Sequence, residues 1–310
     1  MRLTSLGLAL ACIAICSAGR ADPRLQVAIT IDDLPLHAPY PPGVTPEQVG
    51  SQMAAALQAG RVPAIGFVNA FHLQRAPDTE EVLASWRKAG LVLGNHGWAH
   101  RALSQMTPTE FEDELTKGEP LLEKLGTGTD WRWFRYPFLD EGKDEAQRIA
   151  ARQILSRHGY RVAHVTMGFS DWAFTPAYAR CASLGNAAAL AQLEGMYMDS
   201  ARENLAVARE AAHKLYGRDI PYVLLMHVSA LSAKMMPQVI ELYRHAGFRF
   251  VTITQAERDP VYRAYTQLSL APPPSQVEIA KRKGVVLRQS IDLSAKLASM
   301  CPAAVAASSR

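Results

Sequence analysis

The chain has 310 residues, of which 48% are hydrophobic and 20% charged, and its formal net charge is +4 at pH 7. These values are typical of a globular protein with enough apolar material for one large domain or two modest ones, and they exclude a dominant disordered character. The small positive excess gives no support for binding to nucleic acid or for strong attraction to a membrane surface.

Residues 1–21 predict a secretory signal peptide. Arg2 supplies a positive charge, an apolar run covers 6–16, and small residues follow that suit cleavage. The run is too short to span a bilayer, although an uncleaved anchor is the alternative interpretation. Removal of Arg2 and Arg20 with the leader lowers the formal charge from +4 to +2. We therefore expect a periplasmic or secreted protein without a transmembrane segment.

Cysteine usage bears on the same question. Removal of the leader also takes away Cys12 and Cys16 and leaves Cys181 and Cys301. These two could form a disulfide in an oxidising compartment, and two free buried thiols are the alternative that the sequence leaves open. The sequence contains no C-x-x-C motif, so it gives no support for a cysteine zinc site or a thioredoxin-like redox role.

From residue 25 onward, predicted strands and helices alternate. The predicted strands cover residues 25–31, 64–68, 91–93, 131–134, 160–166, 222–226 and 248–253. The predicted helices cover residues 45–60, 79–89, 107–125, 144–158, 186–216 (with Gly195 as a break point) and 236–246. This repetition predicts an α/β fold in which parallel strands are covered by helices, namely a (β/α)7-8 barrel, with an open doubly wound sheet as the alternative.

The domain organisation follows from where this pattern ends. The alternation covers residues 22–260, which we expect to form the main domain, and it fades beyond Pro260. A proline-rich break at 271–274 follows. We expect residues 261–310 to form a helical extension or a loose tail.

Functional groups in such a barrel are expected at the C-terminal ends of the strands. Polar or aromatic residues follow five of the predicted strands: Asp32, Asp33, His96, His100, Arg135, Asp171, Trp172 and His227. His96 and His100 are four residues apart, so both imidazoles would leave one side of a helical turn as a pair of zinc ligands. Each residue has an ordinary structural explanation, but their joint occurrence at one end of the barrel favours a site.

Five motifs in order resemble those of the polysaccharide deacetylases with the NodB homology domain, also called carbohydrate esterase family 4. The motifs are Thr30–Pro35, His96–His100, Arg135–Phe138, Asp171–Trp172 and Leu225–His227. The resemblance covers about residues 25–255 and implies a distorted (β/α)7-8 barrel whose main domain is catalytic. The departures from the family pattern indicate a divergent branch: Ile31, Leu34, Gly168 and Val228.

The resemblance also implies a role for each site residue. Asp33, His96 and His100 would hold Zn²⁺, or another divalent transition metal such as Co²⁺ or Ni²⁺. Around the metal, Asp32 would be the general base, Arg135 its partner, His227 the general acid and Asp171 the support of His227. For the substrate, the backbone N–H of Phe138 would face the oxyanion, Trp172 and Leu225 would wall the acetyl slot, and Tyr136 would also line the site.

These roles predict a metal-dependent hydrolase that removes N-linked or O-linked acetyl groups from a carbohydrate, such as a cell-envelope or extracellular polysaccharide. One alternative is an amidohydrolase of a small non-sugar amide. An alternative of another class is a non-catalytic carbohydrate-binding protein on the same fold. The sequence leaves the glycan, the native metal and the oligomeric state open.

The other histidines and aromatic residues receive structural interpretations. His37 and His72 lie near the predicted mouth of the site and could touch substrate, but we expect them to be solvated loop histidines. Four further histidines on helices or strands are expected to be structural: His158, His164, His213 and His245. Packing is at least as good an explanation as sugar stacking for Tyr40, Trp98 and Trp131.

Overall fold

The computed structural model describes residues 25–302, so the predicted signal peptide lies outside the described residues. Its centre is a sheet in which every strand pair is parallel, in the order β5-β4-β3-β2-β1-β7-β6, with β8 paired to the start of β1. The strands are β1 (Leu25–Leu34), β2 (Ala64–Val68), β3 (Val92–Asn95), β4 (Trp133–Phe134), β5 (Arg161–Val162), β6 (Met167–Gly168), β7 (Tyr222–His227) and β8 (Phe248–Phe250).

The sheet curls into a half-barrel, which confirms the predicted distorted barrel and makes the doubly wound alternative wrong. The two ends of the strand order, β5 and β6, are separated in the chain by only residues 163–166. This short segment therefore crosses the open side of the half-barrel. The predicted strand 160–166 is too long for the same reason: only Arg161–Val162 forms a strand, because the chain then leaves one edge of the sheet and joins the other.

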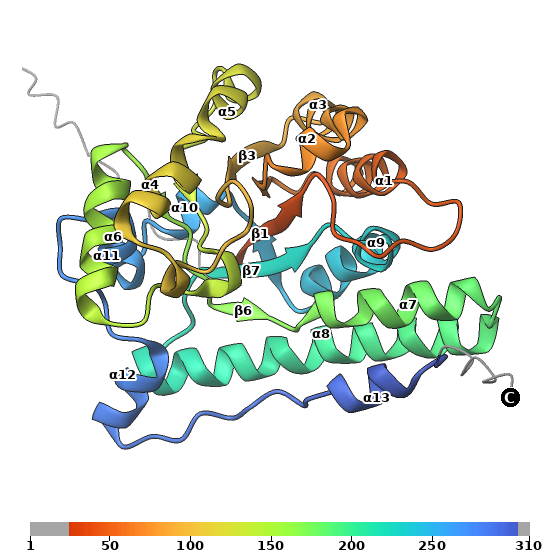
Figure 1. The fold of residues 1–310 in the computed structure, drawn as a ribbon. Coiled ribbons are helices and arrows are strands. Elements are labelled where there is room, and N and C mark those ends of the chain that lie inside the picture. The colour runs from red at the N-terminus through yellow and green to blue at the C-terminus, as the bar shows by residue number, and fades with distance from the viewer. Residues whose placement is uncertain (1–24, 303–310) are drawn as a thin grey trace, which may run out of the picture.

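Helices cover the outside of the sheet (Figure 1). The longer ones are α1 (Pro46–Ala59), α3 (Glu80–Lys88), α4 (Pro108–Thr116), α5 (Glu119–Gly126), α6 (Glu145–Arg157), α7 (Phe174–Ser183), α8 (Ala187–Tyr216) and α9 (Ala230–His245). The shorter ones are α2 (His72–Arg75), α10 (Ile253–Ala256), α11 (Arg263–Thr266), α12 (Gln276–Lys283) and α13 (Ser294–Ser299). The helices α5, α3, α1, α9, α8 and α7 pack side by side in that order, which follows the order of the strands beneath them.

Local signals explain where several helices begin. Thr45 and Thr107 each form a capping box with the residue three positions on, and a proline follows each of them at the first helical position. These are the starts that the sequence predicts. Gly195 does not interrupt α8, which is continuous for 30 residues.

The bounds predicted for two helices and one strand need correction, and one helix was missed. The predicted helix 107–125 is two helices, because Pro120 has no N–H to donate and its ring would clash with the preceding turn, so α4 ends and α5 begins. Helix α9 begins six residues before the predicted 236, because the Ser229 side chain caps it by accepting a hydrogen bond from the Ser232 N–H. The last predicted strand, 248–253, ends at Phe250, because Thr252 caps α10. Helix α7 was not predicted at all.

The segment after Pro274 runs back along α8 and ends beside α7 (Figure 1). A disulfide joins Cys181 of α7 to Cys301, which answers the question that the sequence left open. The Arg180 guanidinium donates to the carbonyl oxygens of Leu297 and Met300, at 2.8 and 3.1 Å from Nη2.

Because disulfides persist in oxidising compartments, the bond between Cys181 and Cys301 favours a location outside the cytoplasm. Among residues 25–302, no helix is long and apolar enough to cross a membrane.

Candidate active site

Two successive carboxylates end the central strand. Successive side chains of a regular strand point to opposite faces, but the pairing of β1 with β2 shifts register between Ile31 and Leu34. Asp33 itself has a left-handed backbone with φ of 66°, a conformation that aspartate tolerates better than most residues. Asp32 and Asp33 consequently line the same pocket at the C-terminal end of the sheet.

Three side chains converge there as candidate metal ligands. The Oδ1 atom of Asp33 lies 3.5 Å from Nε2 of His96 and 3.4 Å from Nε2 of His100. One ligand atom from each of the three residues falls within a group no wider than 4.8 Å. The buried Asp33 Oδ1 has no hydrogen-bond partner among the described residues, as expected of an atom that faces a cation. One carboxylate and two imidazoles form a donor set that suits zinc and related metals.

The segment that carries the two imidazoles is irregular rather than the predicted helical turn. Gly97 has φ of +75° and His100 has φ of 55°, so the chain bends where a helix would continue. The Asn69 amide braces the bend by donating to the His96 carbonyl at 2.7 Å. The Nδ1–H of His96 donates to the carbonyl of Arg135 at 2.8 Å, which leaves the Nε2 lone pair facing Asp33.

The protonation states of the cluster suit metal binding. Burial acts to raise the pKa of Asp33, but the nearby imidazoles of His37, His96 and His227 outweigh it and hold that pKa well below its ordinary value. Burial, together with the neighbouring His96, lowers the pKa of His100 to about 4. At neutral pH the cluster therefore offers an ionised carboxylate and a neutral imidazole, the forms in which both groups bind metals.

Asp32 lies deeper than Asp33 and pairs with Arg135. Nη1 of Arg135 lies 3.3 Å from both carboxylate oxygens of Asp32. The guanidinium is fixed from its other sides, because Nε donates to the Ala163 carbonyl at 2.7 Å and Nη2 donates to the Thr30 hydroxyl at 3.1 Å. Both partners are almost fully buried. Arg135 thus provides a fixed positive charge for a carboxylate that borders the ligand cluster.

His227 ends β7 beside Asp32 of the neighbouring strand β1 and pairs with Asp171. One Asp171 oxygen lies 2.9 Å from His227 Nδ1, and the other accepts from the His227 backbone N–H at 2.7 Å and from the Ser232 hydroxyl at 3.0 Å. Burial acts to lower the pKa of His227, but the Asp171 carboxylate outweighs it and raises that pKa to about 9. At neutral pH this imidazole is therefore a proton donor.

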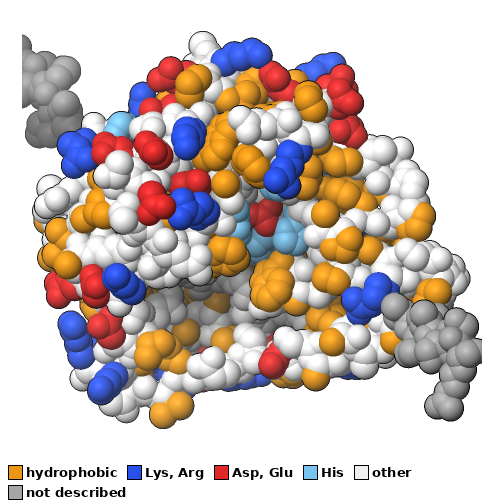
Figure 2. Space-filling view, in the orientation of Figure 1, with side chains coloured by type: hydrophobic (Ala, Val, Ile, Leu, Met, Phe, Trp, Pro, Cys, Tyr) orange, Lys and Arg blue, Asp and Glu red, His pale blue; other side chains and the backbone are white. Residues whose placement is uncertain are grey.

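The pocket has a volume of about 330 Å³, and its floor holds the histidines and carboxylates described above. Figure 2 shows histidine and acidic side chains at the bottom of a hollow on this face. Phe138, Trp172 and Leu225 line the walls. Phe138 is 69% exposed and its ring lies 4.4 Å from that of His100. Tyr136, by contrast, is buried against Phe111 outside this pocket.

Unusual backbone conformations gather around this pocket. Seven of the described non-glycine residues have positive φ. Five of these border the pocket or its adjoining cavity: Asp33, His100, Phe138, Leu139 and Ser170. Such conformations cost free energy and persist where the surrounding structure holds them for function.

His37 belongs to this pocket, so its interpretation as a solvated loop histidine is wrong. Its Nδ1 lies 2.6 Å from Oδ2 of Asp33, and its ring centre lies 5.2 Å from that of His227. The signal in the sequence was that His37 follows Asp33 by four residues. The loop after β1 has no regular structure, however, so the direction of the His37 side chain could not be deduced from it. His72 does not line the pocket.

Comparisons with known proteins agree with this geometry. Residues 19–163 match the family model described as polysaccharide deacetylase, a range that includes Asp32, Asp33, both candidate histidine ligands and Arg135. Asp171 and His227 lie beyond the matched range. No curated protein sequence matches the chain.

Several solved structures have a similar fold. A CE4 family pseudoenzyme from Bacillus anthracis is 14% identical, with 76% of this chain and 66% of that chain covered at a TM-score of 0.53. This chain thus spans about two thirds of its length. A mutant of that pseudoenzyme with restored enzymatic activity is 15% identical over 76% of this chain and 68% of that chain, also at 0.53. The peptidoglycan deacetylase PdaC from Bacillus subtilis is 20% identical over 80% of this chain and 96% of that chain, at 0.50.

Proposed function

Because the chain is a divergent member of the polysaccharide deacetylase family, we propose that it is a metal-dependent hydrolase that removes acetyl groups from a carbohydrate. The observation that supports this most is the arrangement of three groups in one pocket. A cluster of three candidate metal ligands shares one pocket with a carboxylate paired with Arg135 and an imidazole paired with Asp171. A binding protein would need none of these pairs.

Asp33, His96 and His100 would hold the metal, and Zn²⁺ is the ion we propose, with Co²⁺ and Ni²⁺ as alternatives. The unpartnered Oδ1 of Asp33 and the orientation of His96 both fit a cation at this position. When bound, such a metal supplies a Lewis acid for the acetyl carbonyl and makes a nearby water easier to deprotonate.

Asp32 would be the general base that takes a proton from the attacking water. The paired Arg135 guanidinium fixes the orientation of the Asp32 carboxylate, since its own hydrogen bonds to Ala163 and Thr30 hold it in place. A base must be aimed before it can act, and the buried pair provides this condition.

His227 would be the general acid. It is protonated at neutral pH because Asp171 raises its pKa, and it lines the same pocket as Asp32. The proton would go to the leaving amine nitrogen of an N-linked acetyl group, or to the leaving oxygen of an O-linked one. The same residues can serve both reactions, because each needs one base and one acid.

The remaining site residues would position the acetyl group. The backbone N–H of Phe138 would donate to the developing oxyanion, while Trp172 and Leu225 would wall a small apolar slot for the acetyl methyl. Tyr136 would act from behind, because its buried ring packs against Phe111 and Phe134 and so anchors the chain two residues before Phe138. We further propose that the protein acts in the periplasm or outside the cell, in agreement with its disulfide.

The second candidate function is carbohydrate binding without catalysis, which the likeness to a pseudoenzyme structure favours. The test is acetate release from a panel of acetylated sugars and small amides, run with metal analysis of the purified protein. We expect one bound divalent metal and turnover on the sugars. His100→Gln should lose metal and turnover together, while His72→Gln, a nearby histidine outside the pocket, should keep both.

The possible outcomes separate the hypotheses. Metal without turnover on any sugar, but with turnover on small amides, would favour an amidohydrolase of non-sugar substrates. A protein that binds glycans with neither metal nor turnover would be the non-catalytic form.

A further inference from the structure

A cavity of about 400 Å³, separate from the candidate active site, lies beside β4 and the edge strand β5. Trp133 and Arg161, the first residues of these two strands, line one part of it. Residues between 254 and 267, which lead from α10 into α11, line the rest. The cavity shares no lining residue with the active-site pocket. Because three of its lining residues are arginines, we call it the arginine cavity.

Part of the charge around the arginine cavity is balanced within the protein. Arg161 forms an ion pair with Asp130. Asp259, the one aspartate that lines the cavity, forms an ion pair with Arg218 at 2.8 Å. These two pairs cancel, so neither Asp130 nor Asp259 is available to the other arginines of the cavity.

Two positive charges remain, on Arg258 and Arg263. Both side chains are exposed, and within residues 25–302 neither has a carboxylate partner. Nε of Arg263 donates only to the neutral Gln267 side chain, at 3.2 Å. Glu257 also lines the cavity, but burial raises the pKa of Glu257 well above its usual value and keeps its carboxyl neutral. The arginine cavity therefore presents two uncompensated positive charges.

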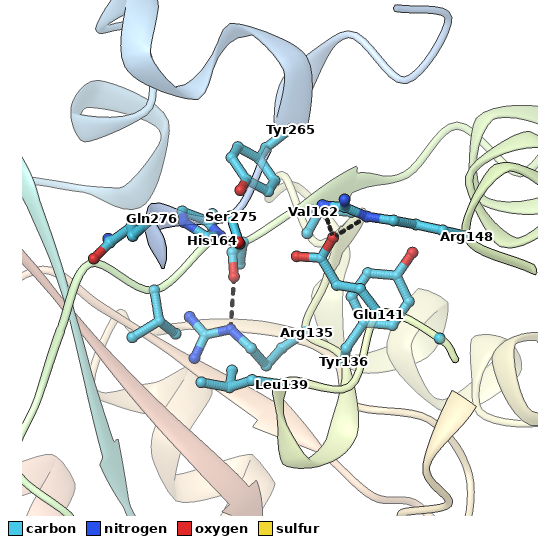
Figure 3. A pocket seen from close by; sticks show the side chains of 13 residues that line it. Arg135, Tyr136, Leu139, Glu141, Arg148, Val162, His164, Tyr265, Ser275 and Gln276 are labelled. Atoms are coloured by element: carbon cyan, nitrogen blue, oxygen red, sulfur yellow. Dashed lines mark hydrogen bonds and ion pairs between the residues drawn. The ribbon is translucent and has the colours of Figure 1, made fainter. Parts of the chain in front are cut away.

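The cavity that is lined by the next residue of β5, Val162, differs in this respect (Figure 3). It has a volume of about 330 Å³, and its charged residues are Arg135, Glu141 and Arg148. Glu141 accepts from Nε of Arg148 at 2.8 Å, an ion pair that Figure 3 shows beside the cavity. Arg135 pairs with Asp32 at 3.3 Å. Each arginine there has a carboxylate partner, so that cavity offers no free charge to a ligand.

Two buried polar atoms on residues that line the arginine cavity also lack partners. Nε1 of Trp133 and Oε2 of Glu257 have no hydrogen-bond partner in the part of the chain that the structure describes. The two residues are 1% and 3% exposed. Such groups are costly to leave unpaired, and an atom from outside the chain often completes them.

The chemistry of these two atoms indicates what is missing. The indole N–H of Trp133 is a donor only. Oε1 of Glu257 accepts from the His164 backbone N–H at 3.0 Å, which favours the proton of the neutral carboxyl on Oε2 and makes Oε2–H a donor as well. The Arg161 guanidinium lies 4.0 Å from the centre of a Trp133 ring and holds the indole in place. The missing partner is therefore a hydrogen-bond acceptor.

We propose that the arginine cavity is a binding site for a phosphate monoester of a small molecule. A phosphate monoester carries close to two negative charges near neutral pH, which match the charges of Arg258 and Arg263. Its oxygens are strong acceptors, and guanidinium groups bind them with paired hydrogen bonds. The volume is within the range of small-molecule sites and leaves room for the organic part of the ligand. Because the cavity is separate from the candidate active site, this inference does not rest on the proposed function.

The experiment is calorimetric titration of the full-length, metal-loaded protein with inorganic phosphate and with glycerol 3-phosphate, at constant ionic strength. We expect one site per chain for each probe, with a dissociation constant below about 1 mM. Arg258→Gln and Arg263→Gln each remove one exposed positive charge and should weaken binding about tenfold. The control is Arg282→Gln, because Arg282 is an exposed arginine on α12 that does not line the cavity. It should keep the wild-type affinity.

A further variant separates this site from the metal centre. His100→Gln should lose the metal and still bind phosphate. If His100→Gln abolishes phosphate binding while Arg258→Gln and Arg263→Gln leave it unchanged, the phosphate binds at the metal and the inference is wrong.

Three other results would overturn the inference. The first is no binding of either probe at a concentration of about 10 mM. The second is equal weakening in Arg258→Gln, Arg263→Gln and Arg282→Gln, which would indicate attraction to the overall charge. The third is tighter binding of succinate than of glycerol 3-phosphate, which would assign the cavity to dicarboxylates.

Discussion

Two charge pairs meet in the pocket, and they use the same two kinds of group in opposite roles. In the pair of Asp32 and Arg135, the carboxylate faces the ligand cluster and the cation supports it from behind. In the pair of Asp171 and His227, the cation faces the pocket and the carboxylate supports it. In both pairs the supporting member is only 1% exposed. One pocket thus holds a carboxylate supported by a cation, and an imidazole whose pKa a carboxylate raises to about 9.

The comparison shows what decides each role. Both supporting groups form further hydrogen bonds with the surrounding structure. Arg135 donates to Ala163 and Thr30. Asp171 accepts from the Ser232 hydroxyl and from the backbone N–H of His227. Since the supporting groups cannot turn, the working groups are held in one orientation. The four predictions below test this division of labour, in order of decreasing effect.

The largest effect is expected from Asp32→Asn, which keeps the shape of the side chain and removes its ability to take a proton. Turnover should fall by about 10³-fold, within the range typical of a lost general base, while the bound metal per protein stays unchanged. The matched control is Glu257→Gln, because burial raises the pKa of Glu257 well above its usual value, so that it is already neutral. Equal turnover in the wild type and Asp32→Asn would contradict the assignment of the base.

Asp171→Asn should have the next largest effect, because it removes the charge that raises the pKa of His227. The acid must be protonated, so the wild-type rate should hold below a pH of about 9 and fall above it. Without the Asp171 carboxylate, burial lowers the pKa of His227, and the alkaline limb of the kcat profile should move below pH 7. At pH 8 this corresponds to a loss of about 10²-fold, in keeping with a lost general acid. An unchanged alkaline limb would show that His227 is not the acid.

His37→Ala extends the comparison to a third pair, in which the imidazole supports the carboxylate of Asp33 at 2.6 Å. Loss of such a partner of a metal ligand should weaken metal affinity about tenfold. Competition with a chromophoric chelator measures this without any turnover. His72→Ala is the control and should keep the wild-type affinity. The same affinity in both variants would remove His37 from the site.

The smallest effect is expected from Ser232→Ala, which takes away one of the hydrogen bonds to Asp171. The charge of Asp171 stays in place, so kcat should fall about threefold, and the alkaline limb should move down by less than one pH unit. Tyr197→Phe removes a hydroxyl one step further out, which donates to Ser232, and should change the profile less. A larger shift in Tyr197→Phe than in Ser232→Ala would mean that packing, not this chain of hydrogen bonds, positions the carboxylate.

Parts of the fold could be predicted because the information is local. The strand β1 and the helices capped at Thr45 and Thr107 follow from hydrophobic runs and capping residues within a few positions of each other. The short strands β5 and β6 could not be separated in the sequence. Their division depends on which edge of the sheet each one joins, and that is decided by residues far away in the chain.

The site divides in the same way. The residue types of the site and their order along the chain could be predicted, because each group follows a strand and the ends of parallel strands meet at one edge of the sheet. The position of His37 in the pocket could not be predicted, since it depends on an irregular loop that brings His37 back to Asp33. The return of residues 275–290 to α8 could not be predicted either, because no local pattern in the sequence indicates it.

The sequence by itself determined most of the order of strands and helices, the identity of the groups that could bind a metal or carry a proton, and the presence of two cysteines able to pair. Only the tertiary structure decided that a bulge turns Asp32 and Asp33 into one pocket, and that an irregular bend aims His96 and His100 at the same carboxylate oxygen. It also decided that Asp171 meets His227. The physical reason is that residue types and periodicity are local properties, whereas distances, burial and the resulting pKa values depend on segments that meet only when the whole chain is packed.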